Sequence, residues 1–137
     1  TNVYALREAL RLVAEEGIEE RCDRHLRVAG ALKAGVEGMG LEMNAPEDFW
    51  LPSLNTVRVP DGVDDGAVIQ QLLDEYDLEI ASGLGALEGD IWRIGCMGHS
   101  ARRKNVSYLL AALGNALGEQ GATVDVDAGL AAMSERF

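Results

Sequence analysis

The stretch Ile91-Trp92-Arg93-Ile94-Gly95-Cys96-Met97-Gly98 decides the fold, because it places one arginine inside an otherwise apolar strand that runs into a glycine. A guanidinium in a buried strand is costly unless it is paired. One reason to hold Arg93 there is a bidentate fork for a carboxylate, which arginine fits better than lysine. The other is a structural ion pair with an acidic side chain, or a strand end where the head group reaches water. The spacing of the residues leaves both interpretations open.

The segment upstream predicts another strand followed by a helix. Residues 54–59, Leu-Asn-Thr-Val-Arg-Val, are rich in β-formers and alternate in polarity. Pro60-Asp61-Gly62 closes this strand with turn chemistry. Asp64 or Asp65 then offers an N-cap for a short amphipathic helix.

Residues 78–81 predict a further strand, and Ser82-Gly83-Leu84-Gly85 predicts the loop that follows it. The glycines permit positive φ and a close backbone approach, which suits a loop that lines a ligand pocket. An ordinary turn between two strands fits the same residues. We therefore single out Ser82, Gly83 and Gly85 as candidate pocket-lining residues.

Apolar residues at helical spacing predict one long helical region over residues 4–39. Gly17 interrupts this pattern at a cost of roughly 1 kcal/mol relative to alanine, which predicts a kink or a break. A last long helix is expected after Ser100 as its cap, and Asp127 is the expected cap of a short helix in the tail.

The predicted order is helix, strand, helix, strand, strand, helix, which is typical of an α+β layer. We expect a small three-stranded, mainly antiparallel sheet covered on one face by helices and led by the long N-terminal helix. A sheet of this size is stable only with such a cover, and its other face must stay wet or meet a partner. The uncovered face of the sheet is therefore expected to dock on a partner.

Composition and charge exclude several functions. The 137 residues carry a formal net charge of −11, so a nucleic-acid duplex repels the surface. No apolar run is long enough to span a bilayer, which predicts no membrane partner. Cys22 and Cys96 lack CxxC spacing, so we expect apolar packing residues in a reducing, cytoplasmic compartment, without a metal site. His25, expected on a helix as a surface or partly buried residue, and His99 have no catalytic partners in motif context.

Five motifs in the order and spacing of one enzyme family cover about residues 4–121. They are Tyr4-Ala5-Leu6-Arg7-Glu8-Ala9-Leu10, Leu51-Pro52-Ser53-Leu54-Asn55-Thr56-Val57, Ser82-Gly83-Leu84-Gly85, Ile91-Trp92-Arg93-Ile94-Gly95-Cys96-Met97-Gly98 and Arg102-Arg103-Lys104-Asn105-Val106. On these residues the chain resembles the C-terminal small domain of class V, fold-type I aminotransferases that use pyridoxal 5'-phosphate. The resemblance is to the alanine–glyoxylate and serine–glyoxylate (serine–pyruvate) group. It implies a small domain over residues 1–121, interdomain helix included, and a C-terminal extension over 122–137.

By this resemblance, Arg93 matches the arginine that binds the α-carboxylate of the substrate. The whole protein is then implied to be a homodimeric transaminase that moves an amino group from alanine or serine to glyoxylate. The Schiff-base lysine and the other groups that hold pyridoxal phosphate are implied to come from a large domain. Lys33 and Lys104 are the only lysines and match no such context. We therefore expect the chain alone to contain no catalytic or cofactor-binding residue and to be inactive.

The sequence departs from the family at two positions that bear on specificity. Ser82 stands where the family often has glycine, and Asp90 stands where it often has lysine or a similar residue. The same carboxylate-binding arginine serves ureidoglycine–glyoxylate transamination in purine breakdown, which is an alternative activity. A different class of function, a stand-alone α+β module without catalysis, is compatible with the missing lysine and the acidic surface.

Overall fold

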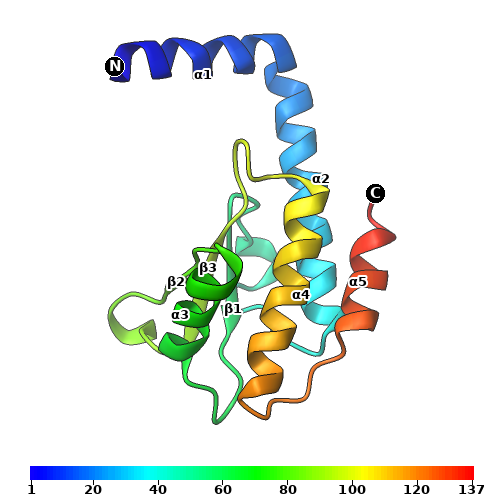
Figure 1. Cartoon of the computed structure of the whole chain (residues 1–137). Coiled ribbons are helices and arrows are strands. Elements are labelled where there is room, and N and C mark those ends of the chain that lie inside the picture. Colours follow the sequence, from blue (N-terminus) through cyan, green and yellow to red (C-terminus); the bar gives the residue numbers. More distant parts are fainter.

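The computed structural model describes residues 1–137 and places a three-stranded antiparallel sheet beside a layer of helices (Figure 1). The strands are β1 (Leu54–Arg58), β2 (Ala81–Ser82) and β3 (Ile91–Gly95), in the order β1-β3-β2. The expected α+β architecture is confirmed. The central strand is the one that carries Arg93, so both of its edges are hydrogen-bonded to neighbours.

The alternation of side chains along β3 gives the sheet two different faces. Trp92 and Ile94 point to the inner face, where they join a buried cluster of 23 residues with Cys96 just beyond the strand. Arg93 points to the opposite, outer face and is half-buried. The sheet thus buries its apolar side and leaves the arginine on the other.

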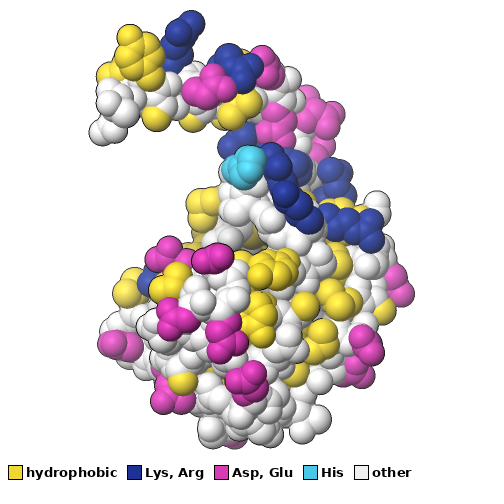
Figure 2. Space-filling view, in the orientation of Figure 1, with side chains coloured by type: hydrophobic (Ala, Val, Ile, Leu, Met, Phe, Trp, Pro, Cys, Tyr) yellow, Lys and Arg dark blue, Asp and Glu magenta, His cyan; other side chains and the backbone are white.

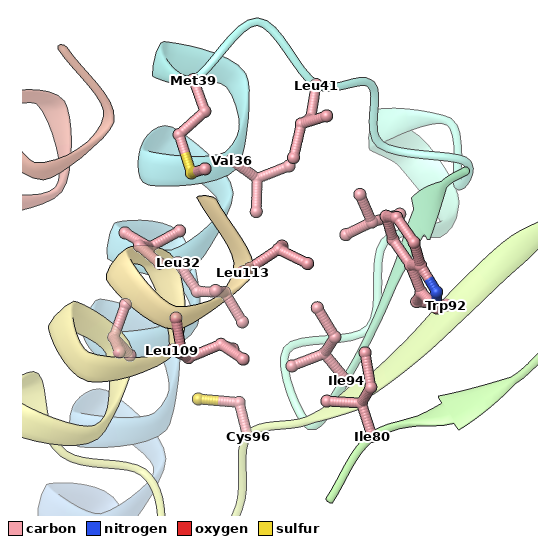
Figure 3. Close-up of a cluster of buried hydrophobic side chains, with 14 of the residues drawn as sticks. Leu32, Val36, Met39, Leu41, Ile80, Trp92, Ile94, Cys96, Leu109 and Leu113 are labelled. Atoms are coloured by element: carbon pink, nitrogen blue, oxygen red, sulfur yellow. The ribbon is translucent and has the colours of Figure 1, made fainter. Parts of the chain in front are cut away.

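Four helices form the core with the inner face of the sheet. They are α2 (Ile18–Gly38), α3 (Asp65–Tyr76), α4 (Arg103–Glu119) and α5 (Val126–Ser134). Figure 3 shows side chains of α2 and α4, Leu32, Leu109 and Leu113 among them, facing Trp92 and Ile94 of β3. Burying a side chain of this size is worth about 1.5–3 kcal/mol, so this layer supplies most of the stabilisation of the fold.

The helical region predicted over residues 4–39 is two helices that meet at an elbow. α1 (Asn2–Glu16) ends where Gly17 adopts φ 83° and ψ 145°, and α2 begins at the next residue. The break expected at Gly17 is therefore present. α1 has no buried residue and projects from the rest of the chain as an arm (Figure 1).

The tail forms α5, which packs against α2 and α4. The approach to α2 is close, because a Cβ on Gly129 would lie 2.8 Å from the carbonyl oxygen of Gly35 and 2.4 Å from Cγ of Met39. Met133 on the same helix is buried in the core. The cap of α5 is Asp125, which accepts from the amide of Ala128, and not the expected Asp127, which lies in the first turn.

Two other expected boundaries are wrong for local reasons. Residues 78–81 do not form a strand over their length, because the amide of Leu78 donates to the carbonyl of Leu72 (3.0 Å) and closes α3 after a left-handed Asp77. α4 starts at Arg103 rather than next to Ser100, whose hydroxyl donates to the carbonyl of Met97 (2.7 Å). The expected cap of α3 is present, since Asp64 accepts from the amide of Ala67.

No helix is both long enough and apolar enough to cross a membrane.

Candidate functional site

Arg93 lies at the middle of the central strand, opposite Thr56 on β1 and Ala81 on β2. Paired residues of antiparallel strands point to the same face, so small side chains flank the arginine on both sides. The backbone under it is held by two ladders at once. The backbone of Arg93 is therefore held in place by its pairing with both neighbouring strands.

One hydrogen bond within the chain orients the Arg93 side chain. Its Nε donates to the carbonyl oxygen of Ser82 at 2.7 Å. No carboxylate lies within 4.0 Å of the guanidinium, and neither Nη1 nor Nη2 has a hydrogen-bond partner. The structural ion pair considered from the sequence is therefore not formed inside this chain. Two parallel N–H groups remain available, which is the geometry that binds a carboxylate in bidentate fashion.

The Ser82–Gly85 segment supports that carbonyl. The Ser82 hydroxyl donates to Oδ2 of Asp65 (2.6 Å) and accepts from the amide of Gly89 (3.0 Å). A Cβ on Gly83 would lie only 1.9 Å from the carbonyl oxygen of Leu87, so this position requires glycine. Gly85 adopts φ 58° with no atom within 4 Å of a Cβ placed there. These residues fix the loop beside Arg93, and their role in lining a pocket stays a prediction.

The turn after β3 is held by residues that sequence reasoning missed. Arg24 on α2 donates to the carbonyls of Gly98 (3.0 Å) and Ala101 (2.8 Å), and His25 accepts from the amide of Gly98 (2.8 Å). His25 and Gly98 are 73 positions apart in the chain. No local sequence pattern predicts such a contact. Two adjacent basic residues within the predicted helical region, Arg24 and His25, were its only trace in the sequence.

Charge is unevenly distributed around this turn. Figure 2 shows Lys and Arg side chains gathered where the α1 arm meets α2 and the start of α4, while acidic side chains are spread over the lower body and the arm. The run Arg102-Arg103-Lys104 at the start of α4 is exposed. Burial raises the pKa of the neighbouring Cys96 thiol, so Cys96 is a poor nucleophile. The other cysteine, Cys22, is exposed and is not the packing residue that we expected.

The two lysines of the chain lie away from Arg93. Lys33 Nζ lies 3.4 Å from Oε1 of Glu47 and 5.8 Å from the ring centre of Trp50. Lys104 is an exposed residue in the first turn of α4. Both lysines are on helices that cover the inner face, whereas Arg93 points to the outer face. No cluster of His, Cys, Asp and Glu forms a metal site.

No protein-family model matches the chain, but curated proteins do. It is 46% identical over 113 residues to the (S)-ureidoglycine–glyoxylate transaminase of Bacillus subtilis, covering 82% of this chain and 27% of that protein. It is 38% identical over 117 residues to the alanine–glyoxylate aminotransferase of Felis catus, covering 85% of this chain and 28% of that protein. The chain thus spans little more than a quarter of the length of these relatives, in their C-terminal part.

Solved structures give the same result in three dimensions. The ureidoglycine–glyoxylate aminotransferase of Bacillus subtilis matches with a TM-score of 0.93 and 41% identity, over 97% of this chain and 34% of that one. A pyridoxamine–pyruvate aminotransferase from Mesorhizobium loti matches with a TM-score of 0.88 and 35% identity, over 93% and 33%. A match over 97% of the chain includes most of the tail after Gly121, which the sequence motifs did not reach.

Proposed function

We propose that this chain, which is homologous to the C-terminal small domain of class V aminotransferases, supplies the carboxylate-binding arginine of a pyridoxal-phosphate-dependent transaminase. The proposed reaction moves an amino group from alanine or serine to glyoxylate. The observation that carries the proposal is the free guanidinium fork of Arg93, held on the outer face of the sheet by the Ser82 carbonyl. The names of the relatives support glyoxylate as one substrate.

In this proposal the residues of the chain bind and orient the substrate. Nη1 and Nη2 of Arg93 donate to the two carboxylate oxygens, and the flanking Thr56 and Ala81 leave room for the ligand. Fixing one end of a small amino acid reduces the orientations of its reacting carbon, which lowers the entropic part of the barrier. Pyridoxal phosphate, when bound by the rest of the protein, supplies the electron sink for the chemistry.

The remaining parts of the proposal concern the whole protein. We assign residues 1–121 to the small domain and 122–137 to a C-terminal extension that packs on it through α5. A large domain precedes this segment and provides the Schiff-base lysine, and two subunits form a homodimer. Two free cysteines support a reducing, cytoplasmic location.

Ureidoglycine–glyoxylate transamination is the second candidate, because the relative with 46% identity carries that name. Both candidates use the same arginine for a carboxylate, so Arg93 does not separate them. A panel of amino donors tested with glyoxylate on the full-length enzyme does. A native polypeptide with the 14.7 kDa mass of this chain would instead favour a non-catalytic module.

Arg93→Ala and Arg93→Lys in the full-length enzyme test the proposal. We expect the KM for the amino donor to rise by about 10- to 100-fold in Arg93→Ala, because charge-assisted hydrogen bonds are worth about 1.5–3 kcal/mol. Arg93→Lys should recover only part of this loss, since lysine lacks the planar fork. Visible absorbance of the cofactor should stay unchanged in both.

Arg58→Ala is the matched control, because Arg58 lies on the neighbouring strand and pairs with Glu42 at the surface. It should leave the KM unchanged. The proposal fails if Arg93→Ala has the turnover and the KM of the unmodified enzyme.

A further inference from the structure

Two consecutive residues of α2, Arg24 and His25, bind the turn that follows the Arg93 strand. This turn runs from Met97 to Ala101, and both polar groups of its Gly98 are engaged by side chains. The amide of Gly98 donates to Nε2 of His25 (2.8 Å), and the carbonyl accepts from Nη1 of Arg24 (3.0 Å). Both backbone polar groups of Gly98 are therefore hydrogen-bonded to side chains of the same helix.

The hydrogen bonds of His25 define its tautomer. Nδ1 lies 2.6 Å from the carbonyl oxygen of Arg21, and a carbonyl oxygen only accepts. Nδ1 must therefore carry the proton, which leaves Nε2 free to accept from Gly98. The ring acts as a rigid spacer between the backbone of α2 and the backbone of the turn. A side chain with an acceptor at the same reach would serve, and a shorter one would not.

Arg24 extends the contact to the elbow between α1 and α2. Besides Gly98, it donates to the carbonyl of Ala101 (2.8 Å), and its Nε and Nη2 bind both oxygens of Glu16, the latter at 3.0 Å. Glu16 is the last residue of α1 and also accepts from Nη1 of Arg21 (2.8 Å). One carboxylate and two guanidinium groups thus join the elbow to the turn.

A short backbone segment joins the turn to the strand that carries Arg93. Gly98 is three residues beyond Gly95, the last residue of β3. Between them, the amide of Cys96 donates to the carbonyl of Ser53 (2.9 Å), which continues the pairing with the β1 side. Cys96 is only 3% exposed, whereas Gly95 and Met97 on either side of it are exposed. The buried Cys96 and its hydrogen bond to Ser53 therefore form the fixed point that joins the turn to the strand carrying Arg93.

We propose that His25 and Arg24 are positioning residues for the carboxylate-binding Arg93. Their hydrogen bonds to Gly98 fix the position of the Arg93 guanidinium along the strand. The inference rests on the proposed function, because it concerns the same anchor. It assigns a role to two side chains on a helix that faces away from the substrate.

The test compares His25→Asn with His25→Gln in the full-length enzyme. Asparagine reaches only as far as Nδ1, so it keeps the contact with Arg21 and loses Gly98, whereas glutamine presents an acceptor where Nε2 stands. We expect His25→Asn to raise the KM for the amino donor by about threefold to tenfold, since one backbone hydrogen bond is lost. His25→Gln should restore a KM near that of the unmodified enzyme. His99→Asn changes an exposed histidine of the same turn that makes no contact with α2, and it should leave the KM unchanged.

A double-mutant cycle asks whether His25 acts through Arg93. Combined with Arg93→Lys, the effect of His25→Asn on the KM should shrink, because the anchor that it positions is already impaired. Independent, multiplicative effects would overturn the inference, and so would equal KM values for the Asn and Gln variants. If His25→Asn fails to fold, Arg24→Met decides in the same assay, with Arg27→Met as its exposed control. An unchanged KM for Arg24→Met then overturns the inference.

The two proposals fail in different ways. An unchanged KM in Arg93→Lys and Arg93→Ala removes the anchor itself and with it the proposed function. A raised KM in those variants beside an unchanged KM in His25→Asn leaves the anchor in place and removes only the positioning role.

Discussion

Gly83 lies where β2 passes into the loop that leads back to Ile91, and the loop crosses directly over it. A methyl group at this position would overlap the carbonyl of Leu87, which is backbone and cannot swing aside. We expect Gly83→Ala to lower the free energy of unfolding by about 1–3 kcal/mol, as overpacked sites do. Gly30→Ala on α2 is the control, because a Cβ there meets nothing within 4 Å and alanine favours a helix. Urea denaturation that shows Gly83→Ala as stable as Gly30→Ala would contradict this packing argument.

The sequence was sufficient to identify Arg93 but not the residues that hold the turn after its strand. Arg93 was identifiable because a charge in an apolar strand is a local anomaly, and the family motifs then favoured carboxylate binding over an ion pair. The absence of a carboxylate near Arg93 is a property of the folded chain, since it depends on which acidic residues the fold brings to the outer face. The role of Arg24 and His25 could not be predicted for the same reason. Their partners are 73 to 77 positions away.

At the scale of elements, the hydrophobic pattern predicted the helices and the two longer strands, and it misplaced ends. The segment after Tyr76 looked like a strand because it is apolar, yet its first residues are used to terminate α3. The start of α4 moved to Arg103 because the Ser100 hydroxyl is consumed in the preceding turn. Periodicity reports which face is buried, whereas the ends depend on competing hydrogen bonds that the pattern does not contain.

The elbow between α1 and α2 should be sensitive to acid. The hydrogen bond from Arg24, assisted by Arg21, lowers the pKa of Glu16 from 4.5 to about 2. A depressed pKa in the folded state stabilises the protein above the unfolded value, and this contribution is lost as the pH falls from 4.5 towards 2. We expect Glu16→Gln to have a lower Tm than the unmodified chain at pH 6, and this difference should shrink as the pH falls towards 2. Thermal unfolding at several pH values measures this.

Glu20→Gln removes the same charge from an exposed side chain of α2 and controls for net charge. Its Tm should follow that of the unmodified chain across the whole range. A difference between Glu16→Gln and the unmodified chain that is as large at pH 2 as at pH 6 would show that the carboxylate acts there through packing rather than through its charge.

At the scale of the whole molecule, the chain has two surfaces that its own residues leave exposed or only partly covered. One is the outer face of the sheet around Arg93. The other is the α1 arm, where Val3, Tyr4 and Leu6 are 78%, 75% and 60% exposed. Contiguous apolar exposure of this kind marks an interaction surface. The relatives are about three times as long as this chain, and in the proposed full-length protein the rest of the polypeptide would cover both surfaces.

The arm should therefore be dispensable for the folding of this segment. α1 contributes no residue to the buried cluster, so removing residues 1–15 should shift the Tm by less than about 3 °C and reduce self-association of the isolated chain. Removing residues 126–137 is the control of similar size. It takes Met133 out of the core and uncovers Gly35 and Gly38 of α2, which should lower the Tm by about 5 °C or more. Calorimetry and size-exclusion chromatography measure both. If the two truncations lower the Tm equally, α1 belongs to the folding unit, and its apolar stripe is not reserved for a partner.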